Sequence, residues 1–231
     1  MAKEMMQHAK SLFDFGPMAR EYDRWYETPA GQAHDRVQKD DVRRLVRPAS
    51  AGQTLLDVGC GTGHWSAFFA EMGYEVTGVD VSHAMIEAAR SAVFNVSFRV
   101  ADAHELPFGD GAFDIVAAMA TVEFLCDPET AVGEMARCTK AGGHVLIGTL
   151  NRLARLNQDR LANGEEPYLS AQLLSPDGLL ALLASVGPVR MLASPSTEPN
   201  GQRPLAEPEQ RRTSRSRSTL RGPFIVAEVR L

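Results

Sequence analysis

The stretch LLDVGCGTGHWS, residues 55–66, places three glycines directly after a run of apolar residues. Gly59, Gly61 and Gly63 stand at alternate positions, and glycine weakens regular structure, so the backbone itself is expected to have a task here. The apolar run ends at Val58, and a helix is expected to follow the glycines. The stretch therefore predicts a strand, a glycine turn and a helix, which form the first half of a nucleotide-binding β-α-β unit.

Two classes of ligand compete for such a turn. The dinucleotide fingerprint requires G-x-G-x-x-G, in which the last glycine lets the helix and the strand pack closely. Counted from Gly59, the sixth position is His64, so the pattern is G-x-G-x-G. NAD, and with it an oxidoreductase, is therefore the weaker interpretation.

Acids follow the next two expected strands. Asp80 comes directly after residues 74–79 and lies 21 residues past Gly59. An ionised carboxylate at the end of a strand can accept both hydroxyl hydrogens of a ribose. Asp102 closes the third strand, where it can accept a hydrogen bond from an amine such as adenine N6. The alternatives are a solvated turn or cap for Asp80, and a turn acid before Pro107 for Asp102.

Short apolar runs alternate with helical patterns from about residue 54 to residue 193. Apolar strands of this kind are typical of a parallel sheet that helices cover on both faces. Ser82, Asp127 and Ser175 are expected to cap helices that begin just after them. We predict an α/β fold, a doubly wound Rossmann-like sheet of seven strands. The strands are expected at residues 53–58, 74–79, 96–100, 113–119, 144–150, 188–193 and 223–231.

Two segments lie outside this alternating pattern. Residues 1–50 look helical and aromatic, and we expect them to form an N-terminal lid or cap on a domain that spans residues 51–231. Residues 194–221 are rich in Pro, Ser and Arg, which predicts a mobile loop between the last two strands. The arginines of this loop either are solvated or contact an anionic substrate or partner; they are Arg211, Arg212, Arg215, Arg217 and Arg221.

The composition argues against several classes of protein. The 231 residues carry a formal net charge of −5, which gives no reason to expect a nucleic acid or an anionic membrane as a partner. The sequence has no run of about 18 apolar residues, and its first ten residues lack the apolar stretch of a secretory signal. Its 3 cysteines lack a C-x-x-C pair and its 6 histidines lack a metal-like spacing. We expect a cytoplasmic protein with neither a disulfide nor a metal site.

Five stretches of the sequence together resemble a known family. LLDVGCGTG, VTGVD, VADAHELPF, FDIVAAMATVEFL and CTKAGGHVLIGTLN are similar, in order and spacing, to the motifs of class I S-adenosylmethionine-dependent methyltransferases. The similarity covers roughly residues 40–193. EYDRWYETPAGQ and GTLNR also resemble a subgroup that acts on small molecules. The family implies a last strand that is antiparallel to the others.

The resemblance implies how the turn and the two acids hold S-adenosylmethionine. The three glycines let the backbone pass close to the methionine part of the cofactor. Asp57 orders the turn and reaches the amino group through water. Asp80 binds the ribose hydroxyls, and Val81 lies against one face of the adenine. Asp102 takes adenine N6, with the N–H of Ala103 near a ring nitrogen.

The resemblance also implies what surrounds the methyl group. Met119, Ala120 and Thr121, at the end of the fourth strand, line the sulfonium region. Tyr22 and Trp25 come from the N-terminal lid, which closes over the cofactor.

Methyl transfer from a sulfonium needs no obligatory catalytic side chain, because the enzyme mainly holds nucleophile, methyl and sulfur in line. An acceptor that carries a proton benefits from a base, and His64 and Glu123 are the best-placed candidates. The alternatives are a pocket-shaping residue at the start of a helix for His64, and a structural or cofactor-side acid for Glu123.

The acceptor is expected to be a small molecule, by elimination. AMATVEF lacks the Asn/Asp-Pro-Pro-aromatic motif of amino methyltransferases and the Pro-Cys pair of a cytosine-C5 mechanism. Residues 10–50 and 151–174 would then select it, and Arg152, Arg155 and Arg160 either bind an acidic group or form a solvated helical face. A non-catalytic protein that binds S-adenosylmethionine for regulation is the alternative. The pattern selects neither the acceptor atom nor an oligomeric state.

Overall fold

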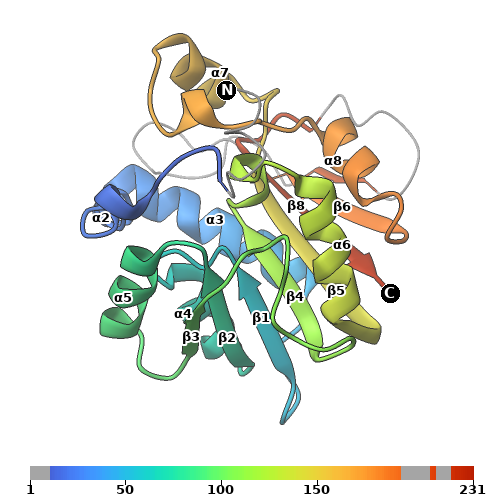
Figure 1. Cartoon of the computed structure of the whole chain (residues 1–231). Helices are drawn as coiled ribbons and strands as arrows, with labels where there is room; N and C mark the ends of the chain where they lie inside the picture. Colours follow the sequence, from blue (N-terminus) through green and yellow to red (C-terminus); the bar gives the residue numbers. More distant parts are fainter. Residues whose placement is uncertain (1–10, 194–208, 212–219) are drawn as a thin grey trace, which may run out of the picture.

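The computed structural model describes residues 11–193, 209–211 and 220–231. Within these residues a single sheet has the strand order β3-β2-β1-β4-β5-β8-β6-β7 (Figure 1). The strands are β1 (Thr54–Val58), β2 (Glu75–Asp80), β3 (Ser97–Val100), β4 (Phe113–Met119), β5 (Thr139–Leu150), β6 (Val189–Ala193), β7 (Glu209–Arg211) and β8 (Phe224–Arg230).

The first five strands are parallel to one another, and β8 is antiparallel to both β5 and β6. All seven predicted strands are present, and the predicted doubly wound sheet with an antiparallel last strand is confirmed. β5 begins at Thr139, before the expected residue 144, because the register with β4 shifts across residues 140–143.

The segment 194–221, for which a mobile loop is predicted, contributes one further short strand. β7 pairs antiparallel with β6 at the edge of the sheet. Leu220 is buried beside β8. The rest of this segment, residues 194–208 and 212–219, lies outside the described residues, and so does the side chain of Arg211. The prediction for the arginines of the loop therefore falls outside the described residues for all of them except Arg221.

Helices cover both faces of the sheet (Figure 1). The predicted caps are confirmed: Ser82, Asp127 and Ser175 each accept a hydrogen bond from the backbone N–H three residues on, at 3.3, 3.0 and 3.1 Å. The helices are α2 (Arg24–Glu27), α3 (Pro29–Leu45), α4 (His64–Glu71), α5 (His83–Ala92), α6 (Pro128–Cys138), α7 (Arg155–Ala162) and α8 (Pro176–Leu183), with short 3-10 turns η1 (Gly16–Met18), η2 (Val122–Phe124) and η3 (Tyr168–Ser170).

The N-terminal 50 residues divide into two parts. α3 packs on the sheet against β6 and β8, and its Val42 and Leu45 belong to the same apolar core as Phe68 and Phe69 of α4. Residues 11–28 instead run past the carboxyl ends of the strands, where Leu12 donates its N–H to the carbonyl of Phe124 at 2.7 Å. In the part of the chain that the structure describes, no helix is long and apolar enough to cross a membrane.

Candidate active site

The glycine turn joins β1 to α4 at the carboxyl end of the sheet. Gly59, Gly61 and Gly63 have φ values of 69°, 53° and 87°, a region that side chains rarely adopt. A Cβ atom at Gly59 would overlap the side chain of Thr121, whereas one at Gly61 would meet nothing within 4 Å. Glycine at the first position thus lets the turn pack closely on the end of β4. At the second it leaves open space beside the backbone.

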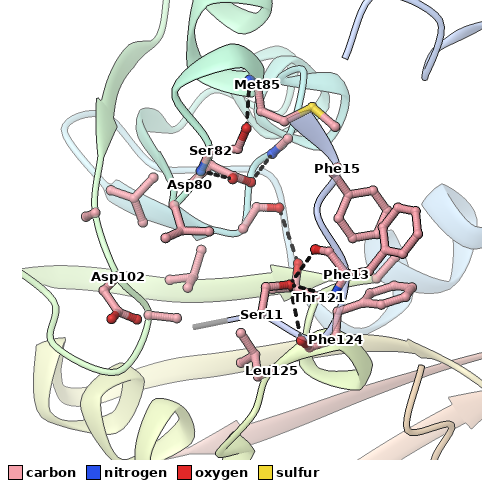
Figure 2. A pocket seen from close by; sticks show the side chains of 18 of the residues that line it. Ser11, Phe13, Phe15, Asp80, Ser82, Met85, Asp102, Thr121, Phe124 and Leu125 are labelled. Atoms are coloured by element: carbon pink, nitrogen blue, oxygen red, sulfur yellow. Dashed lines mark hydrogen bonds between the residues drawn. The ribbon is translucent and has the colours of Figure 1, made fainter. Parts of the chain in front are cut away.

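A cavity of about 260 Å³ lies over this turn (Figure 2). Asp80 and Asp102 border it on one side, and Phe13, Phe15 and Phe124 border it on the other. The two acids come from the ends of β2 and β3, as predicted. The aromatic side comes from residues 11–15, which lie within the expected N-terminal lid, and from η2; the sequence did not single out Phe13, Phe15 or Phe124 as site residues. We call this space the first cavity.

Asp80 is held by backbone donors on both carboxylate oxygens. Gly61 donates its N–H to Oδ2 at 2.9 Å, and Ser82 donates its N–H to Oδ1 at 2.8 Å. Burial raises the pKa of this carboxyl, and the N–H groups of Ser82, Gly61 and Val81 oppose the rise. A carboxylate has about four lone-pair sites, so capacity remains on both oxygens for the two hydroxyls of a ribose. These remaining acceptor sites fit the ribose hydroxyls of S-adenosylmethionine.

Asp102 is held by a histidine that sequence reasoning missed. Its Oδ1 accepts hydrogen bonds from the backbone N–H of His104 at 3.0 Å and from Nδ1 of the same residue at 2.7 Å. Nε2 of His104 accepts from the N–H of Asp127 at 3.3 Å. These partners assign a neutral imidazole with its proton on Nδ1. The Asp102 carboxylate is thereby fixed at the wall of the first cavity, next to Ala103.

A second cavity of about 270 Å³ adjoins the first. Phe15, Tyr22, Ala120 and Phe124 border both spaces, so the two meet at these side chains. Aromatic residues of α2, α4, η3 and β8 are among the other residues that line the second cavity, and Trp25 belongs to this cavity alone. Tyr22 therefore stands at the junction of the two cavities. Of the residues implied around the methyl group, Ala120 and Thr121 border the first cavity.

Three of the residues implied at the cofactor lie beneath the first cavity instead of lining it. Gly63 packs its backbone on the ring of Phe98, and Met119 is 4% exposed and packs against Gly148. Asp57 is 1% exposed and accepts a hydrogen bond from the Ser66 hydroxyl at 2.6 Å. Burial raises the pKa of Asp57 to about 7. These three residues lie in the core under the turn and do not line the cavity. Met119 points inward because alternate residues of β4 face opposite sides of the sheet.

His64 borders neither cavity. Its Nε2 lies 2.7 Å from Oδ1 of Asp35 in α3, and its ring stacks on Tyr26 with centroids 3.8 Å apart. Nearby, the Thr62 hydroxyl donates to Oδ1 of Asp23 at 2.8 Å. These contacts join the glycine turn and the start of α4 to residues 23–26, so His64 contacts the N-terminal segment rather than the space where an acceptor fits.

Glu123, the other candidate base, is fully buried in η2 and also borders neither cavity. Its Oε1 accepts the N–H of Leu150 at 3.1 Å, and its carbonyl accepts the N–H of Gln172 at 2.7 Å. Burial raises the pKa of the carboxyl to about 7, although its own N–H and that of Leu150 favour the ionised form. The residue joins η2 to β5 and to the segment before α8.

The raised pKa of Glu123 predicts a pH-dependent stability. Because its pKa is about 7 in the folded protein against an ordinary 4.5, the folded state holds the proton more tightly than the unfolded state. The resulting stabilisation is fully present below pH 4.5 and is lost as the pH rises through about 7. Between pH 5 and pH 8, the free energy of unfolding should fall by about 2–3 kcal/mol more in the native protein than in Glu123→Gln.

Urea unfolding at several pH values in this range measures that difference. The solvent-exposed Glu129→Gln variant is the control, and it should show the pH dependence of the native protein. Equal pH dependence of the native protein and Glu123→Gln would show that the Glu123 carboxyl does not carry the effect.

Comparison with known proteins gives the family. Residues 56–147 match the model of the methyltransferase domain. The chain is 37% identical, over 147 residues, to a phosphatidylethanolamine N-methyltransferase of Cereibacter sphaeroides, covering 60% of this chain and 69% of that protein. It is 33% identical, over 174 residues, to an O-methyltransferase of Aspergillus sclerotiorum, covering 71% and 66%. The chain belongs to the class I S-adenosylmethionine-dependent methyltransferases, so the resemblance noted in the sequence is confirmed.

A solved structure supports the same fold. A Thermotoga maritima protein, described as an S-adenosylmethionine-dependent methyltransferase and possible histamine N-methyltransferase, superposes with a TM-score of 0.74 at 24% identity, over 94% of this chain and 97% of that one. The chain spans about half the length of several other curated relatives that it matches. S-adenosylmethionine is the cofactor of the family, and the acids and the open turn of the first cavity fit it. Among the described residues, no group of three His, Cys, Asp or Glu side chains is arranged to hold a metal ion.

Proposed function

We propose that this chain transfers a methyl group from S-adenosylmethionine to a small molecule held in the second cavity. The observation that carries the proposal is the junction of the two cavities at Tyr22, Ala120, Phe15 and Phe124. A cofactor whose ribose is held by Asp80 and whose adenine lies beside Asp102 places its other end toward this junction. A second cavity of about 270 Å³ suits a small acceptor better than a macromolecule.

Bound in the first cavity, S-adenosylmethionine supplies a methyl group on a positively charged sulfur. With its ribose on Asp80 and its adenine beside Asp102, the cofactor would donate this methyl group to a lone pair of the acceptor and leave as S-adenosylhomocysteine. The chain orients the two reactants and excludes water. Phe15 and Phe124, whose ring centroids are 4.9 Å apart, form an apolar wall at the junction.

We also propose that two segments act as lids over this site. Residues 11–28 cover the first cavity, and residues 155–170 close the far side of the second through α7 and η3. α3, which also lies within the expected N-terminal lid, belongs to the layered core instead. Of residues 11–50, only residues 11–28 cross the carboxyl ends of the strands, and these residues form the proposed N-terminal lid.

The test is formation of S-adenosylhomocysteine in the presence of a panel of small acceptors, with mass spectrometry of the products. Product formation with at least one acceptor, above the rate without acceptor, supports the proposal. Binding of S-adenosylmethionine without any methylated product would favour the alternative, a cofactor-binding protein that does not transfer.

The position of His64 predicts that it is not the base of this reaction. We expect His64→Phe, which keeps a ring against Tyr26, to retain kcat within about threefold, because general-base catalysis contributes about 10²–10⁴-fold and His64 lies away from the acceptor space. The measurement is kcat with the acceptor that the panel identifies. A loss of about 100-fold or more, with unchanged affinity for S-adenosylmethionine, would return His64 to the role of base.

A further inference from the structure

The second cavity is bordered by a carboxamide that makes no hydrogen bond to the described residues and is open to the cavity. Gln38 of α3 lines the cavity and is only 9% exposed. Its side chain makes no hydrogen bond to any described residue. The amide N–H and carbonyl of Gln38 are therefore available to a polar group of a ligand in this cavity.

Three phenol groups border the same cavity. Burial is the largest cause that raises the pKa of Tyr22, Tyr26 and Tyr168; nearby acids add to the rise, and the charge of Arg160 opposes it for Tyr168. The phenols therefore stay protonated and present O–H donors. No hydroxyl of the three bonds to another residue that the structure describes. A cavity with so many unused donors suits a ligand that carries hydrogen-bond acceptors.

The charge beside these donors is positive. The guanidinium of Arg160 lies 4.3 Å from the ring centre of Tyr168 and contacts Oδ1 of Asn157 at 3.3 Å. No carboxylate within the described ranges forms an ion pair with it. Burial and the charge of Arg160 lower the pKa of His34, so His34 is not a second cation at neutral pH. The Arg160 guanidinium is half-buried, and its free N–H donors can form two parallel hydrogen bonds to the two oxygens of a carboxylate.

The two acidic residues that line this cavity differ from Arg160 in exposure and in their partners. Glu21 and Glu166 are both exposed to solvent. Glu21 pairs with Arg24 at 3.2 Å, and Glu166 accepts a hydrogen bond from the Ser170 hydroxyl at 3.0 Å. Each acid is thus solvated and already has a partner, whereas Arg160 is less exposed and lacks an acidic one among the described residues. The arrangement favours an anionic ligand over a cationic one.

The remaining walls are flat and apolar. The rings of Trp65 and Phe224 are stacked with an interplanar angle of 7°, and Trp25 and Phe124 face the same space. Aromatic walls of this kind favour the face or edge of a planar ring. Arg160 borders only the second cavity, while Tyr22 borders both. A group anchored on Arg160 therefore lies in the second cavity and outside the first.

We propose that the second cavity binds a planar aromatic molecule that carries a carboxylate, with the carboxylate on Arg160 and the methyl-accepting atom at the other end, beside Tyr22. This inference rests on the proposed function, since it names the class of acceptor. The carboxylate is the anchor and is not itself methylated. Gln38 and the phenols bind the other acceptor groups of the molecule.

The test uses matched ligands that differ only in charge. Calorimetry in the presence of saturating S-adenosylhomocysteine compares 3,4-dihydroxybenzoate with 3,4-dihydroxybenzamide and 3,4-dihydroxybenzylamine, and repeats the comparison with the hydroxycinnamate and indole-carboxylate counterparts. We expect the acid of at least one set to bind about tenfold or more tightly than its amide, and the amine to bind more weakly than either. The inference is overturned if no acid binds more tightly than its amide.

Variants of two arginines in α7 test whether the Arg160 side chain causes the preference for the acid over its amide. Arg160→Gln should abolish the acid preference while the affinity for S-adenosylhomocysteine stays unchanged, and Arg160→Lys should restore part of it. Arg155→Gln is the matched control on α7, because Arg155 pairs with Asp159 at 3.6 Å and borders neither cavity. An unchanged acid-to-amide ratio in Arg160→Gln would also overturn the inference.

Gln38→Met provides an independent variant in another helix. It should weaken binding of the preferred acid about fivefold or more without changing the affinity for S-adenosylhomocysteine. Binding and transfer separate the two proposals: acids that bind selectively but are never methylated would contradict the proposed function alone. Methylation of neutral or cationic acceptors without an acid preference would contradict only the substrate class.

Discussion

Asp80→Ala should lower the affinity for S-adenosylmethionine by about tenfold or more, or about 1.5–3 kcal/mol of binding free energy. The carboxylate that the variant removes borders the first cavity and keeps lone pairs for the ribose hydroxyls. It also accepts the N–H of Gly61 at 2.9 Å, so the variant frees the backbone of the glycine turn. Both effects act on the same ligand, which makes this one of the largest losses of affinity that we expect.

Calorimetric titration measures the dissociation constant, and Asp80→Asn separates the two effects. The carboxamide that this second variant introduces keeps one oxygen that can accept the N–H of Gly61, but it has a single acceptor oxygen in place of two. An intermediate loss is therefore expected for Asp80→Asn. A dissociation constant unchanged by Asp80→Ala would remove Asp80 from the ribose site.

Gly59→Ala should lower the free energy of unfolding by about 2–4 kcal/mol and abolish cofactor binding at ordinary concentrations. Gly59 has a φ of 69°, which strains any side chain, and the added Cβ would overlap the side chain of Thr121. Relief of that overlap has to move either the turn or the end of β4. Both border the first cavity, so the stability and the site are damaged together.

Gly142→Ala is the matched control for the backbone strain alone. Gly142 has a φ of 79°, but a Cβ there meets nothing within 4 Å, and the residue is remote from both cavities. Its substitution should cost about 1 kcal/mol of stability and leave the affinity for S-adenosylmethionine unchanged. Urea unfolding and calorimetry of both variants measure the contrast. Equal losses in the two would mean that the contact of Gly59 with Thr121 carries no energy of its own.

The sheet and the acid side of the first cavity can be predicted from the sequence, because each element is marked by residues that lie close to it in the chain. The strand that ends at Val58, the glycine turn and the acids after the next two strands are each visible within a few residues. Parallel strands then bring their carboxyl ends to one edge, which places Asp80 and Asp102 side by side without further information. The N-caps at Ser82, Asp127 and Ser175 are local for the same reason.

The aromatic side and the second cavity depend on contacts between distant segments. Phe15 meets Phe124, and Gln38, Arg160 and Phe224 meet across three separate parts of the chain. Nothing in the neighbourhood of any one of these residues indicates its partners. The sequence alone therefore leaves Arg160 either as a ligand contact or as part of a solvated helical face, and the structure is needed to place it at a cavity.

His64 and Glu123 illustrate a different limit. Both follow a strand end in the sequence, where side chains commonly reach a ligand, but neighbouring residues of a turn point in different directions. His64 turns toward Asp35, and Glu123 turns into the core toward Leu150. His104 could not be singled out from the sequence, because its contact with Asp102 depends on how the loop folds and no sequence motif marks it.

The most direct test of the account is a calorimetric titration of the native chain with S-adenosylmethionine and, separately, with NAD. The open glycine turn, Asp80 and Asp102 together predict binding of S-adenosylmethionine with a dissociation constant of about micromolar order and no measurable binding of NAD. Binding of NAD at micromolar concentration, with none of S-adenosylmethionine, would contradict the account at its centre.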